Sequence, residues 1–211
     1  MSSSPSRDTP AGDTFVGDTF PGGTFSGGTF SGDTSPAGDG AAEAVVLRVI
    51  AGLLLRAPGE EEVRALLGAG LAAPPPGDGD HARLLGGLRP GYGPLPPYES
   101  VWRGEGRVMG ETSRQVARAY AAAGARLDVP AGTPPDHVGF EVAFLAYLLH
   151  SRGEAERCGQ TERAARAEAA RRAFLDDHVR AWVPAWCEAV EAADPAGFYG
   201  ALACLLRGYV T

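Results

Sequence analysis

The sequence predicts an all-α fold, in which one helical domain at residues 43–211 follows a disordered, low-complexity tail at residues 1–42. Three observations support this prediction. Apolar residues recur at helical spacing in several segments, glycine and proline separate these segments, and no segment alternates apolar and polar residues convincingly, as a half-buried strand would. The chain has 211 residues, which is enough for one domain with a sizeable core.

The tail is distinguished by a sequence repeat. GDTF at 12–15 and 17–20, GGTF at 22–25 and 27–30, and GDT at 32–34 follow one another every five residues. Frequent glycine makes ordering of the backbone costly, and one phenylalanine per repeat cannot build a core. We therefore predict disorder for residues 1–42. The alternative is an arm whose phenylalanines bind another surface.

Two helices are predicted after the tail. Residues 42–56 carry apolar side chains at i, i+3 and i+4 spacing, and Pro58 and Gly59 end this segment. Its apolar positions are Val45, Val46, Val49, Ile50, Leu53 and Leu54. Residues 60–70 begin with three glutamates, which suit the positive end of a helix, and finish on glycine.

The middle of the chain is rich in proline and glycine. Three consecutive prolines open a connecting segment at residue 74, and a short helical turn is expected at residues 83–88. Residues 89–110 have no periodicity and predict a long surface loop, a kind of segment that is often functional in compact domains. Residues 111–123 predict another helix, with Gly124 as its C-terminal stop.

The most apolar stretch is residues 133–150, which predicts a buried central helix. Pro134 and Pro135 stiffen the chain before it. Asp136 stands where an N-cap belongs, because its carboxylate can accept a backbone N–H of the first turn. The expected element is thus a proline-stiffened hinge that carries an acid and a histidine at the start of the core helix.

The C-terminal part predicts the longest helix, at residues 161–182, which Pro184 kinks or ends. His178 lies on its apolar side, which is typical of a core histidine with one hydrogen bond. Trp182 and Trp186 are also expected in the core. Asp194 followed by proline predicts the start of a last helix, which runs to about residue 209.

Composition excludes several function classes. The net charge is −7 and no basic stripe is visible, which argues against nucleic acid as a partner. No phosphate loop, dinucleotide fingerprint, catalytic serine motif or matched set of metal ligands is present, so we expect no enzyme, no cofactor and no metal.

The chain also carries no signature of export or membrane insertion. It has no run of 18 apolar residues and no secretion signal, so we expect a cytoplasmic protein without membrane insertion. The three cysteines are odd in number and widely spaced, which is typical of small buried hydrophobes in a reducing compartment.

Five clusters of polar and aromatic residues remain to be explained. They are PPYESVW at 96–102, Tyr120 with Gly124, PDHVGFEVAF at 135–144, FLDDHVRAWVPAW at 174–186, and FY at 198–199. Together and in this order they resemble the TorD/DmsD family of redox-enzyme maturation proteins. The resemblance covers about residues 43–211, most securely 94–211. The chain departs from the family in a shortened region before the first cluster, in Ala143 where a glutamate is common, and in the repeat tail.

The resemblance implies an all-helical cytoplasmic chaperone. Such a protein binds the apo form and the twin-arginine signal peptide of a molybdenum-cofactor oxidoreductase, assists cofactor insertion and delays export. Family members are monomers or homodimers. The segment PPYESVW at 96–102, called the proline loop from here on, and the hinge at 134–137 are the regions that the family ties to peptide binding. In this sequence they carry the candidate residues Tyr98, Glu99, Ser100, Trp102, Asp136, His137 and Glu141.

A twin-arginine peptide presents two guanidinium groups followed by an apolar run, so its site needs carboxylates and an apolar groove. We expect Glu99, Asp136 and Glu141 to supply the carboxylates. The groove would be formed by Tyr98, Trp102, Phe140 and Phe144. Purely structural roles stay open: Asp136 as an N-cap, Glu141 as a first-turn dipole partner, and the two loop aromatics as an anchor.

Two other function classes are compatible with an all-helical chain. One is a regulatory or oligomerisation module, and the other is a small nucleotide-binding protein. No phosphate loop supports the second. The chaperone hypothesis is preferred because it alone accounts for the five ordered clusters.

Overall fold

The computed structural model describes residues 24–26, 39–68, 70–86, 95–105, 107–129 and 133–211. Its helices are α1 Asp39–Leu55, α2 Glu60–Gly68, α3 Asp80–Leu85, α4 Glu99–Trp102, α5 Glu111–Ala122, α6 Val138–Arg157, α7 Thr161–Phe174, the π-helical η1 Leu175–Val179, α8 Arg180–Ala193 and α9 Phe198–Val210. The strands are β1 Thr24–Ser26 and β2 Arg126–Asp128. The prediction of an all-α fold is confirmed, with two three-residue strands that the sequence did not suggest.

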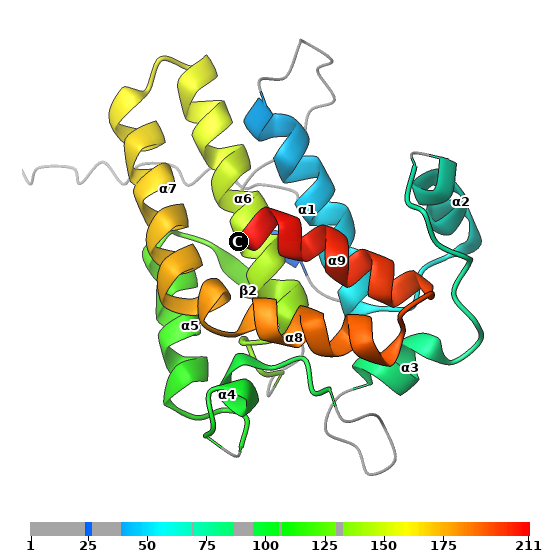
Figure 1. The fold of residues 1–211 in the computed structure, drawn as a ribbon. Helices are drawn as coiled ribbons and strands as arrows, with labels where there is room; N and C mark the ends of the chain where they lie inside the picture. The colour runs from blue at the N-terminus through cyan, green and yellow to red at the C-terminus, as the bar shows by residue number, and fades with distance from the viewer. Residues whose placement is uncertain (1–23, 27–38, 69, 87–94, 106, 130–132) are drawn as a thin grey trace, which may run out of the picture.

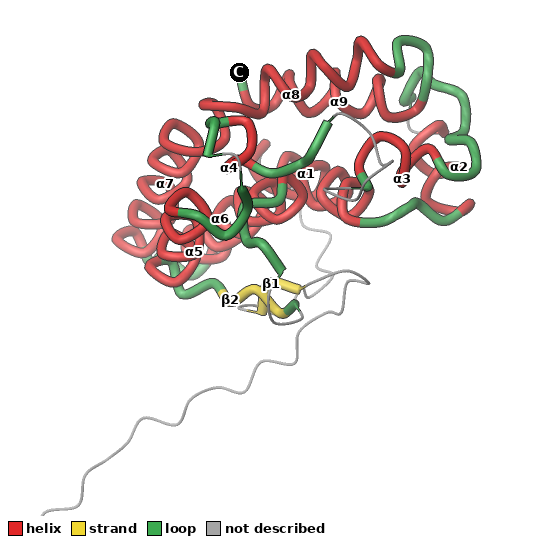
Figure 2. Tube along the Cα trace, turned by 90° about the horizontal axis from the view of Figure 1, so that it is seen from below, coloured by secondary structure: helices red, strands yellow, loops and turns green. Residues whose placement is uncertain are grey.

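The helices surround one apolar core (Figure 1). α6 lies between α1 and α7, and the pair α8–α9 crosses one face of this layer. The two-stranded sheet lies on the opposite face (Figure 2). α6 is buried over most of its circumference from Val138 to Leu149, as its apolar sequence predicts. The stretch identified as the core helix is therefore the centre of the molecule.

α6 can approach α1 closely because its second residue is glycine. A Cβ added to Gly139 would lie 2.5 Å from the Cγ of Leu55 and 3.1 Å from the carbonyl oxygen of Ala51. The first distance is shorter than real Cβ contacts and the second is tighter than most of them, so any larger residue would require the Leu55 side chain to move and would press on the backbone of α1. This contact places the start of α6, and with it the hinge, against the end of α1.

The long C-terminal helix changes direction earlier than expected. α7 and α8 run in clearly different directions in Figure 1, and the π-helical segment Leu175–Val179 joins them. Pro184 lies inside α8 and does not end it. Proline cannot donate to the carbonyl of Arg180, the residue that directly follows the π-helical segment. Trp182 and Trp186, which follow the change of direction, are buried as predicted.

Other boundaries differ by a few residues. α1 begins at Asp39, before the predicted residue 42, and the turn predicted at 83–88 forms instead at Asp80–Leu85. The last helix begins at Phe198, not directly after Asp194. The Asp194 carboxylate still caps this helix, because its Oδ2 accepts the backbone N–H of Tyr199 at 3.0 Å and of Gly200 at 3.2 Å.

The cysteines are free thiols, as their number suggested, but the prediction that they are buried was wrong for two of them. Cys187 is buried within α8, whereas Cys158 and Cys204 are exposed. Cys158 follows the last residue of α6, and Cys204 lies on the exposed side of α9. Within the described residues, no helix combines the length and hydrophobicity needed to cross a membrane.

Part of the predicted tail is described. β1 pairs with β2 in antiparallel register, with Phe25 opposite Leu127. The other tail residues before Asp39 lie outside the described residues, so disorder there stays a prediction.

Removal of the tail is expected to leave the fold intact. A chain starting at residue 39 lacks only β1 among the described elements, and a two-stranded pairing of three residues adds little stability on its own. We expect the thermal midpoint to change by less than about 2 °C. Circular dichroism can compare this chain with one starting at residue 24, which keeps β1. A large loss that occurs only in the shorter chain would show that the β1–β2 pairing contributes to stability.

Candidate functional site

The proline loop and the hinge, which are far apart in sequence, form one unit. Tyr98 and His137 form an antiparallel β-bridge. The N–H of Val138 donates to the carbonyl of Pro97 at 2.8 Å, and the N–H of Glu99 donates to the carbonyl of Asp136 at 3.0 Å. The structure therefore brings together the two regions that the family resemblance connects with peptide binding.

Asp136 is a capping residue, but for a different helix from the predicted one. Its Oδ2 accepts the backbone N–H of Ser100 at 2.9 Å, in the first turn of α4, and its Oδ1 accepts the hydroxyl of Ser113 at 2.7 Å. The carboxylate is fully buried. The prediction that Asp136 is the N-cap of α6 was wrong. Asp136 caps α4 because the bridge holds the hinge against the loop.

His137 is the N-cap of α6. Its Nδ1 accepts the backbone N–H of Gly139 at 3.0 Å. The imidazole ring contacts Tyr98 edge-on at 5.2 Å between ring centroids and lies 5.6 Å from Phe140. Burial, and secondarily the charge of His81, lowers the pKa of His137 to about 3. The ring is therefore neutral at physiological pH, as an accepting Nδ1 requires.

Trp102 anchors the loop to itself. Its indole Nε1–H donates to the carbonyl of Pro96 at 2.8 Å. The side chain packs against the core but stays partly exposed, as does Tyr98 at the opposite end of α4. Because Tyr98, Trp102 and His137 are all partly exposed, they are the candidate residues that a partner can reach in this conformation.

Glu99 lies at the end of α4 that faces η1. Its side chain is fully buried, with the Nδ1 of His178 3.0 Å from Oε2 and the Nη1 of Arg103 2.7 Å from Oε1. Arg103 also donates to the carbonyl of Asp177 at 3.2 Å. The prediction of a core histidine with one hydrogen-bonding nitrogen is confirmed for His178. These contacts tie the loop to the bend between α7 and α8.

Glu141 lies one turn into α6 and is fully buried. Its Oε2 accepts the indole N–H of Trp182 at 2.9 Å. Burial, and then the nearby charge of Glu99, raises the pKa of Glu141 well above its ordinary value. The Oε1 of Glu141 otherwise has no hydrogen-bond partner. When Glu141 is protonated, this oxygen can carry the proton and donate it in a hydrogen bond to the Glu99 carboxylate.

The candidate residues thus divide into two groups. Glu99, Ser100, Asp136 and Glu141 are fully buried. The carboxylates of Glu99, Asp136 and Glu141 accept hydrogen bonds from groups of the loop, η1 and α8, and Ser100 takes part through its backbone N–H. Tyr98, Trp102 and His137 form the outer side of the same unit. None of the three carboxylates is exposed, so a client arginine can reach them only if the loop and hinge separate. The expected pairing with arginines therefore stays a prediction.

The sequence did not identify several partners in this network. Ser113, Arg103 and the hydrogen-bonding role of Trp182 were missed, because each meets a carboxylate that is distant in sequence or lies in a loop without periodicity. The sequence places several acidic residues in segments that are expected near the apolar core. Each buried carboxylate requires hydrogen-bond donors, and this requirement could have indicated the missing partners. Over the described part of the chain, no group of three or more His, Cys, Asp or Glu residues could hold a metal ion.

Comparison with known proteins gives the family of the chain. The sequence model of the nitrate reductase delta subunit family matches residues 78–188. The chain belongs to this family. The matched region contains the proline loop, the hinge, α6 and His178, and thus all seven candidate residues.

Curated relatives connect the family with the TorD/DmsD resemblance. The chain is 29% identical over 114 residues to the chaperone protein TorD of Vibrio cholerae, covering 54% of this chain and 50% of the relative. It is 32% identical over 115 residues to TorD of Aeromonas salmonicida, with the same shares. The predicted membership in the TorD/DmsD maturation chaperones is confirmed. The chain spans about half the length of the curated relatives it matches.

A solved structure is also similar. It is the crystal structure of a candidate redox enzyme maturation protein from Archaeoglobus fulgidus, with 22% sequence identity and a TM-score of 0.41. The match covers 69% of this chain and 99% of that one.

Proposed function

We propose that this protein is a chaperone for the maturation of a redox enzyme. Its client is the apo form of a molybdenum-cofactor oxidoreductase, whose twin-arginine signal peptide it binds in the cytoplasm while the cofactor is inserted. The chain acts without chemistry of its own, and export of the client waits for its release.

One observation carries the proposal. The family match contains both the proline loop and the hinge, and the Tyr98–His137 bridge joins these two segments into a single unit. A loop of proline and aromatic residues that is held by the fully buried side chains of Glu99 and Asp136 is preorganised, and preorganisation lowers the entropic cost of binding a peptide.

Within this unit we assign different roles to the two groups of residues. Tyr98, Trp102 and His137 contact the client, because they are partly exposed. Glu99, Ser100, Asp136 and Glu141 are positioning residues, because they are buried against groups of this chain.

The contact role of Trp102 can be tested directly. Trp102→Ala is expected to weaken binding of the client signal peptide by about 1–3 kcal/mol, the usual range for an aromatic anchor. The free energy of unfolding should change less, since the side chain is only partly buried. Trp102→Phe is the matched control, because it keeps an aromatic surface and removes only the hydrogen bond to Pro96. Titration calorimetry and urea unfolding measure the two quantities. A lower unfolding midpoint with unchanged affinity would make Trp102 a loop anchor only.

The proposed client can be identified by co-purification. A tagged copy of the chain is isolated from its native host, and the proteins that accompany it are identified by mass spectrometry. We expect the catalytic subunit of a molybdenum-cofactor oxidoreductase that still carries its signal peptide. Recovery of only the mature, cofactor-loaded enzyme, or of no such enzyme, would contradict the proposed function.

A further inference from the structure

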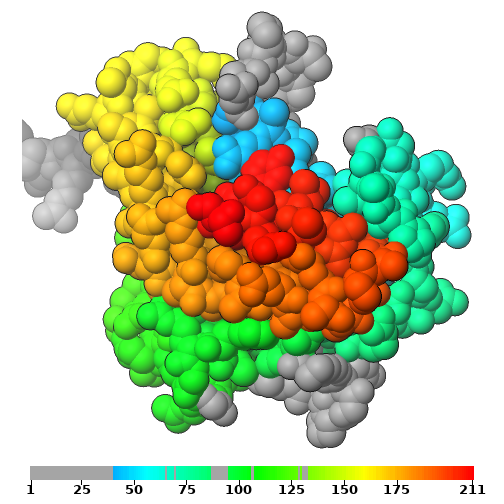
Figure 3. Space-filling model, in the orientation of Figure 1, coloured from blue at the N-terminus to red at the C-terminus, as the bar shows by residue number. Residues whose placement is uncertain are grey.

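A separate pocket lies between the start of α1 and the end of α9. Its volume is about 430 Å³, and its lining residues are Ala42, Glu43, Val46, Gly208 and Tyr209. Figure 3 shows the beginning of α1 and the end of α9 next to each other on one face of the molecule. None of the lining residues belongs to the proline loop or the hinge, so the proposed site does not include the pocket.

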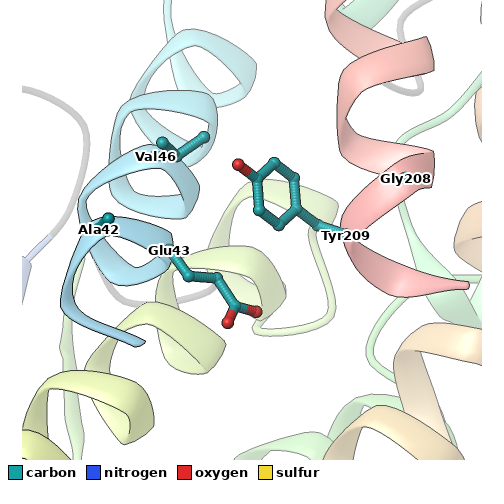
Figure 4. A pocket seen from close by; sticks show the side chains of 5 residues that line it. All are labelled: Ala42, Glu43, Val46, Gly208 and Tyr209. Atoms are coloured by element: carbon teal, nitrogen blue, oxygen red, sulfur yellow. The ribbon is translucent and has the colours of Figure 1, made fainter. Parts of the chain in front are cut away.

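The pocket has apolar walls and one acidic group. In Figure 4 the Tyr209 ring extends from α9 towards α1, with Val46 beside it, and the Glu43 carboxylate extends from α1 into the same space. Glu43 and Tyr209 are both partly exposed. A ligand from solution can therefore reach the carboxylate and the ring together.

The Glu43 carboxylate has no hydrogen bond or ion pair with any other group in the described part of the chain. The charge of Glu43 acts on Arg171, whose pKa is raised first by its hydrogen bonds with Glu168 and also by the charge of Glu43. Arg171 is already engaged, since its Nε and Nη2 donate to Glu168 at 3.0 and 2.9 Å. Glu43 is thus available to an external cation.

Apolar surface adjoins the pocket on both helices. Val49 follows Val46 by three residues on α1, and Leu205 precedes Tyr209 by four on α9, so each lies on the pocket side of its helix. These are two of the few large apolar side chains that are exposed, at 38% and 36%. An acidic pocket continued by exposed apolar residues matches a peptide in which a cationic residue precedes an apolar run.

We propose that the α1–α9 pocket binds an arginine of the client signal peptide, with the following apolar run over Val49 and Leu205. This inference rests on the proposed function and adds the place where the arginine is recognised. The carboxylate pairs with the guanidinium, the Tyr209 ring offers its face to the cation, and Ala42 and Val46 cover the aliphatic stem. The client arginine then does not have to reach the buried carboxylates of the loop and hinge, so these two segments need not separate.

The test uses the full chain and two fluorescent synthetic peptides. One carries two adjacent arginines before an apolar run, and the other has glutamine in place of both arginines. Glu43→Gln is expected to weaken binding of the arginine peptide by about fivefold, the range for a partly exposed ion pair, and to leave the glutamine peptide unchanged. Tyr209→Leu should weaken binding of the arginine peptide by about two- to fivefold, because the aromatic face that attracts the cation is lost. The effect of Glu43→Gln should shrink at high salt, because the lost interaction is electrostatic.

Glu61→Gln is the matched control, since it removes one negative charge at an exposed position of α2 outside the pocket. It should leave both affinities unchanged. If Glu43→Gln keeps wild-type affinity for the arginine peptide while Trp102→Ala loses affinity, the proposal for the pocket is overturned and the proposed function is kept. The α1–α9 pocket would then be left to another occupant, such as a second copy of this chain. Equal binding of the two peptides by the wild type would overturn both.

Discussion

Replacement of Asp136 by alanine is expected to lower the free energy of unfolding by about 3 kcal/mol. The change removes a buried acceptor of two hydrogen bonds and leaves the backbone N–H of Ser100 and the hydroxyl of Ser113 without it. A buried polar group that loses its partner costs about 1–3 kcal/mol. Because Asp136 caps α4, the proline loop should also lose order. Urea unfolding, with hydrogen exchange at residues 99–102, measures both effects.

Asp136→Asn is the control for this prediction. Asparagine keeps one acceptor oxygen for the backbone of α4 and has similar bulk, so we expect a smaller loss of stability than with alanine. The alternative is the original hypothesis that Asp136 pairs with client arginines. In that case Asp136→Asn would leave stability unchanged but reduce affinity for the arginine peptide, and the loss would disappear with the glutamine peptide.

Glu141→Gln is expected to change how stability depends on pH. The pKa of Glu141 is raised in the folded state, by burial first and by the charge of Glu99 next. The folded state therefore holds a proton that the unfolded state releases at the ordinary pKa of glutamate. As pH rises from that ordinary value towards the raised pKa, wild-type stability should fall relative to the variant by about 1.4 kcal/mol per pH unit.

The stabilising contribution of protonated Glu141 is complete below the ordinary pKa of glutamate and is lost once pH passes the raised pKa. Glutamine imitates the protonated acid, because its oxygen can accept from Trp182 and its amide can donate to Glu99. The variant should thus match the wild type at low pH and exceed it at high pH. Glu162→Gln at an exposed position of α7 serves as control. Parallel profiles for wild type and Glu141→Gln would show that Glu141 is ionised when folded.

Much of the fold was predictable because helices have local signatures. The apolar spacing after the tail, the glutamates that begin α2 and the glycine after α5 are all signals within a few residues of the elements they define. The apolar circumference of α6 indicated its central place. The five ordered clusters gave the family, and the comparisons confirmed it.

The roles of the acidic residues were less predictable. The sequence showed Asp136 in front of a helix and favoured a cap on α6, but a cap on α4 depends on a contact between residues 36 positions apart. Glu99 and His178 are 79 positions apart, and Glu141 and Trp182 are 41 apart. No local pattern encodes such pairs, because side chains of separate helices meet only when the core packs.

The sequence by itself determined the helical class, the family and the segments that carry the candidate site, because each depends on residues close together along the chain. Only the tertiary structure decided that four of the seven candidate side chains are buried and that three stay accessible. It also decided that Glu43 of α1 faces Tyr209 of α9 across a pocket. Burial and pockets result from how helices pack against one another, and packing depends on the shape of every contact between them.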